Sequence, residues 1–305
     1  MRASRRFRTS ASRPFTGNSP KPLDETGPLR ISQKFHRYLL LGAGALIVVG
    51  MFGLLENFLL YHPYREIEVT PKAYRIAYEN VSFSAADGVR LHGWYVAPKD
   101  PDGPVLLWTH GNAGNLSHRA ENIALIQKEL GAGVFIFDYR GYGKSEGRPG
   151  EEGLYADGRA AYAWLIERVP PGRIFLFGRS LGAAVVVKLA VEGKKARGLI
   201  LESPFESTLA MGKKMFPFLP VSWLISSKFD SAAMLPKVET PLFVLHGDKD
   251  GIVPFAQGRR LFEAAGSKHK RFFTIKGAGH NDTYYTGGAA YWAAWRDFLE
   301  NPESR

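Results

Sequence analysis

The sequence has 305 residues and a formal net charge of +11, from 40 Lys and Arg against 29 Asp and Glu, and it contains no cysteine. Its apolar content of 45% and charged content of 23% are ordinary for a globular protein and exclude a chain that is disordered throughout. The lack of cysteine excludes disulfides, thiolate metal sites and a cysteine nucleophile. The excess positive charge would suggest nucleic acid or an anionic membrane as a partner, depending on where the basic residues lie.

Most of that excess lies at the N-terminus. Residues 1–37 contain nine basic and two acidic side chains, a net charge of +7, so the rest of the chain carries only +4. The same segment is rich in Ser, Pro and Thr and shows no apolar periodicity, which is typical of a disordered tail. We therefore predict a disordered basic tail over residues 1–37, and we do not expect nucleic acid as a partner.

A long apolar run follows the tail. Residues 39–55 carry no charge, and the run from Tyr38 to Tyr61 is long enough for a helix to cross the roughly 30 Å hydrocarbon core of a bilayer. A buried core helix is the alternative, but four glycines and apolar residues on every face favour lipid. No A-x-A cleavage site follows, so we predict an uncleaved transmembrane signal anchor over 38–61 that contacts membrane lipid. The basic residues before it place the tail in the cytoplasm and the remaining chain on the extracytoplasmic side.

Residues 62–305 alternate between strand-like and helix-like patterns. An antiparallel pair is predicted at 81–83 and 90–96, around the turn signal Asp87-Gly88. Short apolar runs then predict buried parallel strands at 105–108, 134–139, 174–178, 199–202, 241–247 and 272–275. Helical patterns lie at 118–130, 153–168, 181–192, 255–265 and 290–299. This alternation predicts an α/β fold with a doubly wound, mostly parallel sheet flanked by helices, whose chemistry gathers in the loops after the strands.

A nucleophile motif directly follows one of these strands. The pentapeptide Gly178-Arg179-Ser180-Leu181-Gly182 lies between the strand 174–178 and a helical segment. A serine in a strained strand-to-helix turn needs small residues two positions away on each side, which is the G-x-S-x-G spacing. We predict Ser180 as a catalytic nucleophile.

A serine nucleophile needs a base that is itself oriented by an acid. His280 follows the strand 272–275, and we predict that it takes the proton of Ser180 and later donates it to the leaving group. Asp250 follows the strand 241–247 and is the favoured acid, while Asp248 in the same loop and Glu202 at the end of another strand remain alternatives. The expected order along the chain is serine, acid, histidine.

Acyl transfer also requires donors for the oxyanion. One backbone N–H is expected from Leu181, the residue after the nucleophile, and another from Asn112 in the glycine-containing loop 110–115. The glycines of this loop would also suit a phosphate cradle, but neither G-x-x-x-x-G-K-[ST] nor G-x-G-x-x-G is present. We expect no cofactor and no metal, because no convincing ligand cluster occurs and the mechanism needs none.

These motifs resemble the α/β-hydrolase superfamily over roughly residues 78–300. The resemblance is carried by HGNAGNLSHR (110–119), FDYRGYGKSEG (137–147), GRSLG (178–182), LESPF (201–205) and HGDKDGIVP (246–254). In particular the chain is similar to the membrane-anchored serine hydrolases of the α/β-hydrolase domain-containing group and to serine aminopeptidase-like chains. The resemblance implies an eight-stranded type of sheet, Ser180, Asp250 and His280 as the triad, and Asn112 and Leu181 as oxyanion donors. Four residues match a motif that we interpret as bracing the loop beside the active site: Asp138, Tyr139, Arg140 and Ser145.

An apolar insertion at about 205–236 falls where a cap can cover the site. Its Met and aromatic side chains would either line an acyl pocket or pack the cap onto the sheet. The sequence thus predicts a membrane-anchored serine hydrolase that cleaves carboxylic esters or thioesters of lipid-like or small-molecule acyl substrates through an acyl-enzyme. A serine peptidase on the same triad and a non-catalytic membrane-tethered scaffold are the alternative hypotheses.

Overall fold

An eight-stranded sheet forms the centre of the part of the chain that the computed structural model describes, which is Gly17, Tyr38, residues 57–218 and residues 221–304. All of the predicted basic tail (1–37) except Gly17, and most of the predicted span (38–61), lie outside these residues. Among the described residues, no helix is both long and apolar enough to cross a membrane.

The strands follow the predicted apolar runs closely. They are β2 (Glu79–Ser84), β3 (Arg90–Val96), β4 (Val105–Thr109), β6 (Gly133–Asp138), β7 (Ile174–Arg179), β8 (Gly198–Glu202), β9 (Leu242–Gly247) and β10 (Lys270–Ile275), and their spatial order is β10-β9-β8-β7-β4-β6-β3-β2. β2 and β3 pair antiparallel with each other, β3 pairs antiparallel with β6, and the remaining pairs are parallel. Every residue of β4, β6, β7, β8 and β9 is buried, as expected for strands covered on both faces. The prediction of an α/β, mostly parallel eight-stranded sheet is confirmed.

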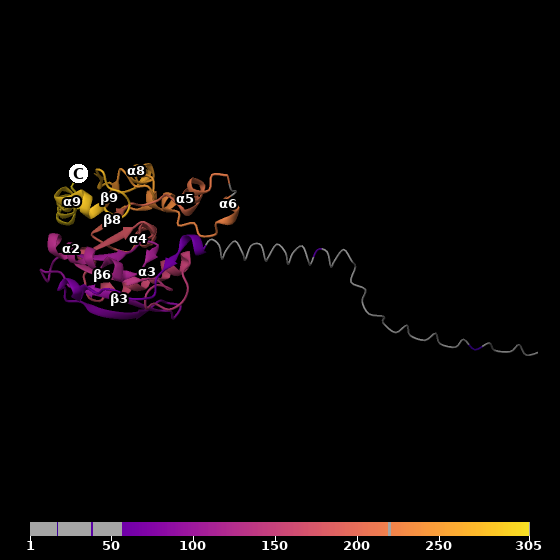
Figure 1. The fold of residues 1–305 in the computed structure, drawn as a ribbon, viewed down its shortest axis with the longest axis horizontal. Helices are drawn as coiled ribbons and strands as arrows, with labels where there is room; N and C mark the ends of the chain where they lie inside the picture. Colours follow the sequence, from indigo (N-terminus) through magenta and orange to yellow (C-terminus); the bar gives the residue numbers. More distant parts are fainter. Residues whose placement is uncertain (1–16, 18–37, 39–56, 219–220, 305) are drawn as a thin grey trace, which may run out of the picture. The chain divides into compact units, whose positions relative to one another are not determined.

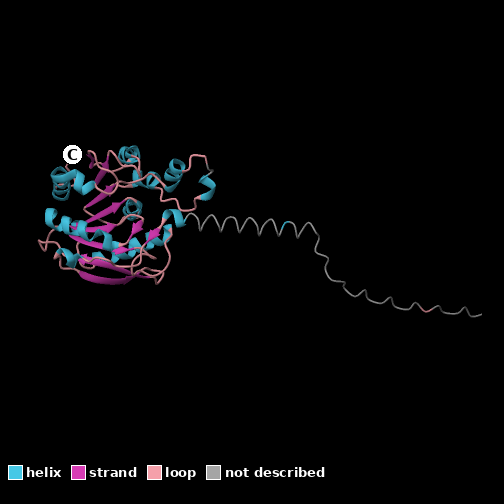
Figure 2. Ribbon diagram, viewed as in Figure 1, coloured by secondary structure: helices cyan, strands magenta, loops and turns pink. Residues whose placement is uncertain are grey.

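Helices cover both faces of this sheet (Figures 1 and 2). α3 (Glu151–Ile166), α4 (Leu181–Val191) and α8 (Phe255–Ala264) pack into one hydrophobic cluster, and α2 (Ala120–Leu130) and α9 (Thr283–Glu300) pack into another. The short 3-10 turns are η1 (Pro71–Tyr74), η2 (Leu116–Arg119), η3 (Pro171–Arg173) and η4 (Leu235–Lys237). The predicted helix at 290–299 begins earlier, at Thr283, and is interrupted by the non-helical Gly288.

The strand order reverses between β4 and β7. From β4 the chain passes to β6 on one side, then returns to place β7 on the other side of β4. Crevices outside the carboxyl ends of strands form at such switch points in open α/β sheets. The loop that begins at His110 follows β4, and Ser180 follows β7, so both lie at this position.

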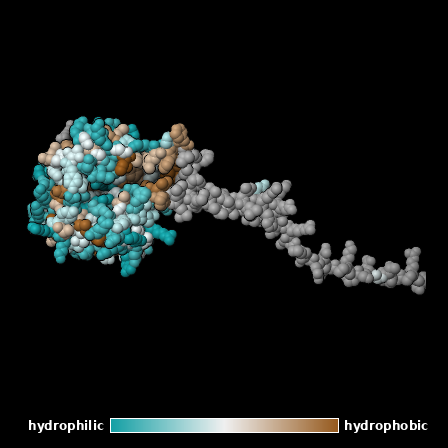
Figure 3. All heavy atoms as spheres, viewed as in Figure 1, coloured by the Kyte–Doolittle hydropathy of each residue, from teal (hydrophilic) through white to brown (hydrophobic). Residues whose placement is uncertain are grey.

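A cap lies between β8 and β9. It contains α5 (Thr208–Met215), α6 (Val221–Leu224) and α7 (Ser231–Met234). Its apolar side chains divide between two environments: Phe229 is fully buried, whereas Met215 is 60% and Phe218 is 97% exposed. Figure 3 shows apolar surface gathered at the end of the domain that carries α5 and α6.

The packing of the domain begins before residue 62. Tyr61, the last residue of the predicted span, is only 3% exposed and belongs to the same core cluster as α3 and α4. Its ring lies edge-on to Phe229 of the cap, with centroids 6.4 Å apart.

Two glycines allow the start of α4 to lie close to strands β4 and β7. A Cβ on Gly182 would lie 2.0 Å from the Thr109 carbonyl oxygen, and a Cβ on Gly178 would lie 2.5 Å from the Gly182 oxygen. Thr109 Oγ1 also donates a hydrogen bond of 2.9 Å to Gly182 O. A side chain at Gly182 would therefore push the start of α4 away from β4, and a side chain at Gly178 would push it away from β7.

We predict that Gly182→Ala destabilises the protein by about 1–3 kcal/mol, because the added methyl overlaps a backbone carbonyl that cannot move without shifting β4. The matched control is Gly172→Ala, since no atom lies within 4 Å of the position of its Cβ. Urea unfolding of both variants measures the difference. Equal free energies of unfolding for the two variants would contradict the packing argument.

Candidate active site

Ser180 occupies a strained turn between β7 and α4. Its φ of 53° and ψ of −118° lie in a region that non-glycine residues rarely adopt. Its backbone N–H donates to Glu202 O at 2.9 Å, which fixes the turn to the neighbouring strand β8. The side chain is partly exposed, and Oγ forms no hydrogen bond with any residue that the structure describes. The geometry is that of a nucleophile elbow, with the hydroxyl available to a substrate.

His280 and Asp250 are joined directly. His280 Nδ1 lies 2.7 Å from Asp250 Oδ2, across the loops that follow β10 and β9. A carboxylate oxygen accepts, so Nδ1 carries the proton and Nε2 is left for another partner. This is the tautomer that a histidine base requires.

Asp250 is held as a carboxylate by several donors. Its Oδ1 accepts the N–H groups of Ile252 and Val253 at 2.9 and 2.8 Å, and His246 Nε2 lies 3.3 Å from Oδ2. Burial alone would raise the pKa of Asp250, but the hydrogen bonds from His246 and His280 outweigh it and hold that pKa well below its usual range. Asp250 is therefore ionised throughout the neutral pH range.

The two alternative acids, Asp248 and Glu202, form hydrogen bonds with other partners. Asp248 Oδ1 accepts the Gly277 N–H at 2.7 Å. The buried Glu202 accepts from Thr283 Oγ1 at 2.8 Å and from the Tyr291 hydroxyl at 2.6 Å. Neither carboxylate contacts His280 in the part of the chain that is described, so the geometry favours Asp250.

Arg179 connects the serine to the histidine loop. Its Nη2 donates to the His280 carbonyl at 2.5 Å, and its Nε lies 3.2 Å from Glu202 Oε1. No direct hydrogen bond links Ser180 to His280 within the described residues, and such bonds are often formed only once substrate is bound. The residue before Ser180 thus fixes the backbone of His280.

The loop with Asn112 lies against Ser180. A Cβ on Gly111 would be 3.6 Å from Ser180 Cβ. The N–H groups of Asn112 and Leu181 have no hydrogen-bond acceptor among the residues described. Free N–H groups near a serine hydroxyl can serve a developing oxyanion.

Several known proteins are similar to this chain in sequence. The family model described as "Serine aminopeptidase, S33" matches residues 100–234 and 230–283. The Arabidopsis thaliana alpha/beta hydrolase domain-containing protein WAV2 is 32% identical over 295 residues, which cover 88% of this chain and 96% of that protein. The chain belongs to the α/β-hydrolase superfamily. An uncharacterized Mycobacterium tuberculosis protein is 40% identical to this α/β hydrolase over 261 residues, covering 84% of this chain and 92% of the relative.

A solved structure shows the same fold. The esterase Pf2001 of Pyrococcus furiosus superposes on this α/β hydrolase with a TM-score of 0.66 at 26% sequence identity, covering 80% of this chain and 99% of the esterase.

Several side chains that brace the α/β-hydrolase site were not singled out from the sequence. His110 is fully buried, and its Nδ1 donates to Gly111 O at 2.7 Å, which orients the peptide that carries the Asn112 N–H. The Tyr142 hydroxyl donates to Asn112 O at 2.8 Å. Arg179 acts over a longer range, through His280. Of these residues, only His110 could have been found from the sequence, because it directly precedes Gly111 of the loop.

Three of the four residues interpreted as bracing the loop beside the site form hydrogen bonds in or next to that loop. The Tyr139 hydroxyl donates to His110 O at 2.8 Å, Asp138 Oδ1 accepts the Leu116 N–H at 2.8 Å, and Ser145 Oγ donates to Asp138 O at 2.6 Å. Arg140 makes its contacts on another side of the motif. Its guanidinium pairs with Asp157 and Asp87 instead, because α3 places a buried carboxylate beneath it.

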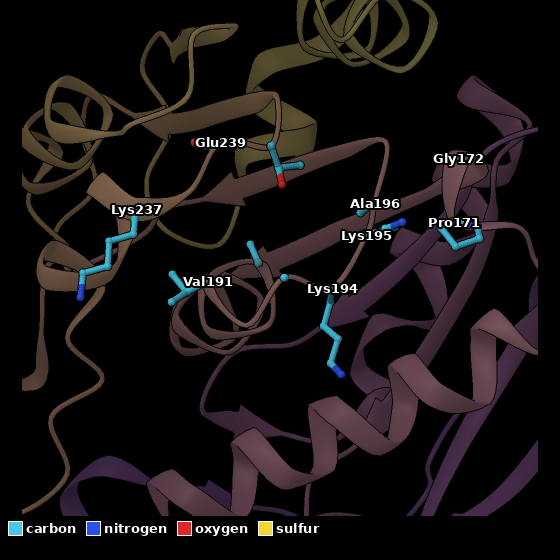
Figure 4. Close-up of a pocket in the computed structure, with 11 residues that line it drawn as sticks. Pro171, Gly172, Val191, Lys194, Lys195, Ala196, Lys237 and Glu239 are labelled. Atoms are coloured by element: carbon cyan, nitrogen blue, oxygen red, sulfur yellow. The ribbon is translucent and has the colours of Figure 1, made fainter.

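A large surface cavity lies away from this site. About 610 Å³ in volume, it is lined by residues that precede β7, β8 and β9, among them Lys194, Lys195 and Lys237 (Figure 4). These positions are at the amino ends of the strands, whereas the catalytic loops follow the carboxyl ends. The cavity therefore belongs to the opposite edge of the sheet.

Proposed function

We propose that this α/β hydrolase is a membrane-anchored serine hydrolase that cleaves carboxylic esters or thioesters of lipid-like or acyl substrates. Ser180 is the nucleophile, His280 the general base and acid, and Asp250 the residue that orients the histidine. The observation that carries the proposal is the 2.7 Å bond from His280 to the ionised Asp250 beside the strained Ser180 turn.

The reaction proceeds in two halves. His280 Nε2 takes the Ser180 Oγ proton as Oγ attacks the carbonyl carbon, and the resulting oxyanion accepts the N–H groups of Leu181 and Asn112. His280 then returns the proton to the leaving alkoxide or thiolate as the carbon–oxygen or carbon–sulfur bond breaks, which leaves an acyl-serine. Water repeats the sequence in the second half, releasing a carboxylic acid and restoring the serine. Asp250 stays ionised and stabilises the imidazolium that forms in both halves.

Two features support an apolar acyl substrate. The related Pyrococcus furiosus protein is named an esterase. The cap also exposes Met215 and Phe218, which adapt well to alkyl chains. Residues 38–61 hold the enzyme at a membrane in this proposal, with residues 1–37 in the cytoplasm and the catalytic domain on the extracytoplasmic side.

The second candidate is a serine peptidase that uses the same three residues. The description of the matching family model as a serine aminopeptidase favours it. The leaving nitrogen of an amide must be protonated before the carbon–nitrogen bond breaks, and the same histidine can supply that proton.

Substrate panels separate the two candidates. We predict that the full-length chain in detergent micelles hydrolyses p-nitrophenyl esters, with kcat/KM rising as the acyl chain lengthens. Aminoacyl arylamides, measured in parallel, are expected to react slowly or not at all. Turnover of the arylamides alone would replace the esterase with the peptidase, and a preference for the shortest esters would contradict the lipid-like substrate.

Substitution of each candidate acid identifies the triad. We predict that Asp250→Asn lowers kcat by up to about 10⁴-fold, because the amide favours the wrong histidine tautomer. The control Asp248→Asn should lower kcat far less, because that carboxylate accepts the Gly277 N–H and pairs with Lys276 but makes no contact with the His280 side chain among the described residues. Kinetics on the best ester measure both variants. A larger loss of kcat in Asp248→Asn than in Asp250→Asn would refute the assignment.

A further inference from the structure

The chain that enters the domain from the predicted span lies alongside the proposed oxyanion loop. We call residues 57–66 the junction segment. Within it, β1 (His62–Pro63) runs parallel to β5 (Ala113–Gly114), and these four residues form a two-stranded sheet apart from the main one. None of the steps of the proposed reaction involves the pairing of β1 with β5, so the pairing needs a separate explanation.

The junction segment holds Asn112 from two directions. Asn112 Nδ2 donates to Leu60 O at 2.9 Å, and the His62 N–H donates to Asn112 O at 3.0 Å. The side chain and the carbonyl of the residue proposed as an oxyanion donor are thus both bonded to the segment. Its N–H remains without an acceptor among the residues described.

The pairing continues beyond Asn112. The Tyr64 N–H donates to Gly114 O at 3.2 Å, and Asn115 Nδ2, which belongs to a fully buried residue, donates to Tyr64 O at 3.0 Å. The segment is itself fixed to the domain, because Tyr61 is buried against Phe229. It can therefore act as a rigid support for the loop.

The loop needs such a support. Gly111 and Gly114 interrupt it, and Gly114 has a φ of +80°, so its own backbone restricts it weakly. An oxyanion donor stabilises a transition state only when it is aimed before the reaction begins. The hydrogen bonds of the junction segment provide that constraint from a part of the chain about 50 residues away in the sequence.

We propose that residues 60–64 of the junction segment are a positioning element of the oxyanion hole. They hold the loop 110–115 so that the Asn112 N–H faces the place where the oxyanion forms. This inference rests on the proposed serine hydrolase. It implies that turnover depends on the same segment that connects the domain to its predicted anchor, so a chain cut after residue 61 would lose activity as well as the anchor.

The test compares His62→Pro with His62→Ala in the full-length chain. Both variants lose the imidazole, but only proline removes the N–H that donates to Asn112 O. We expect His62→Pro to lower kcat about tenfold relative to His62→Ala, less than the roughly 10²–10³ that complete loss of an oxyanion donor costs. KM should change little. The affinity for an alkyl trifluoromethyl ketone, which forms a tetrahedral adduct on the serine, should fall in parallel with kcat/KM.

Asn112→Ala tests the same support in case proline prevents folding. It removes the bond to Leu60 O but keeps the backbone N–H, and we expect a loss of kcat and of ketone affinity with an unchanged thermal midpoint. Equal kcat and equal ketone affinity in His62→Pro and His62→Ala, or wild-type values of both in Asn112→Ala, would overturn the inference. The proposed function fails in a different way, with no ester turnover by the wild type or equal turnover by Ser180→Ala.

Discussion

The contact between α4 and β4 is the constraint on which the site depends. Gly182 allows the backbone of α4 to meet that of β4, Gly178 allows the same helix to begin close to β7, and Ser180 between them has a φ of 53°. A conformation of this kind costs on the order of 1–3 kcal/mol and persists only where the surroundings over-determine it. The surroundings here are the burial of eight of the eleven residues of α4 and the bond from Ser180 N–H to Glu202 O. The stability of the core thus keeps Ser180 in its strained conformation, with the hydroxyl partly exposed.

The other parts of the site are aligned to this fixed serine by separate long-range supports. Arg179 and the buried Glu202 fix the His280 loop, and Thr283 and Tyr291 complete the hydrogen bonds of that carboxylate. Burial and the charge of Glu202 raise the pKa of the Tyr291 hydroxyl well above its usual value, so it stays a donor. A buried ion pair of this type contributes little net stability, but its fixed geometry suits it to holding a loop in place. The loop 110–115, which is proposed to hold the oxyanion, is supported independently by His110, by Tyr142 and by the junction segment.

The local parts of this arrangement could be predicted from the sequence, and the long-range parts could not. Strands such as β6 and β7 are uninterrupted apolar runs, and G-x-S-x-G is a contiguous motif, so both are visible without a fold. The choice among Asp250, Asp248 and Glu202 depends on which carboxylate meets His280 across two loops, which only the structure supplies. The pairing of residues 60–64 with the loop 110–115 leaves no periodic or compositional signal. The start of α9 was not predicted, because Gly287 and Gly288 interrupt the helical pattern of its first turns.

Covalent labelling of the serine tests the central claim most directly. The full-length chain is treated with a fluorophosphonate probe, and the labelled peptide is located by mass spectrometry in the wild type and in Ser180→Ala. The account predicts one stoichiometric adduct on Ser180, formed at a rate that falls in Asp250→Asn, and no adduct at that peptide in Ser180→Ala. An unlabelled wild type, or equal labelling of Ser180→Ala, would contradict a serine hydrolase built on this site.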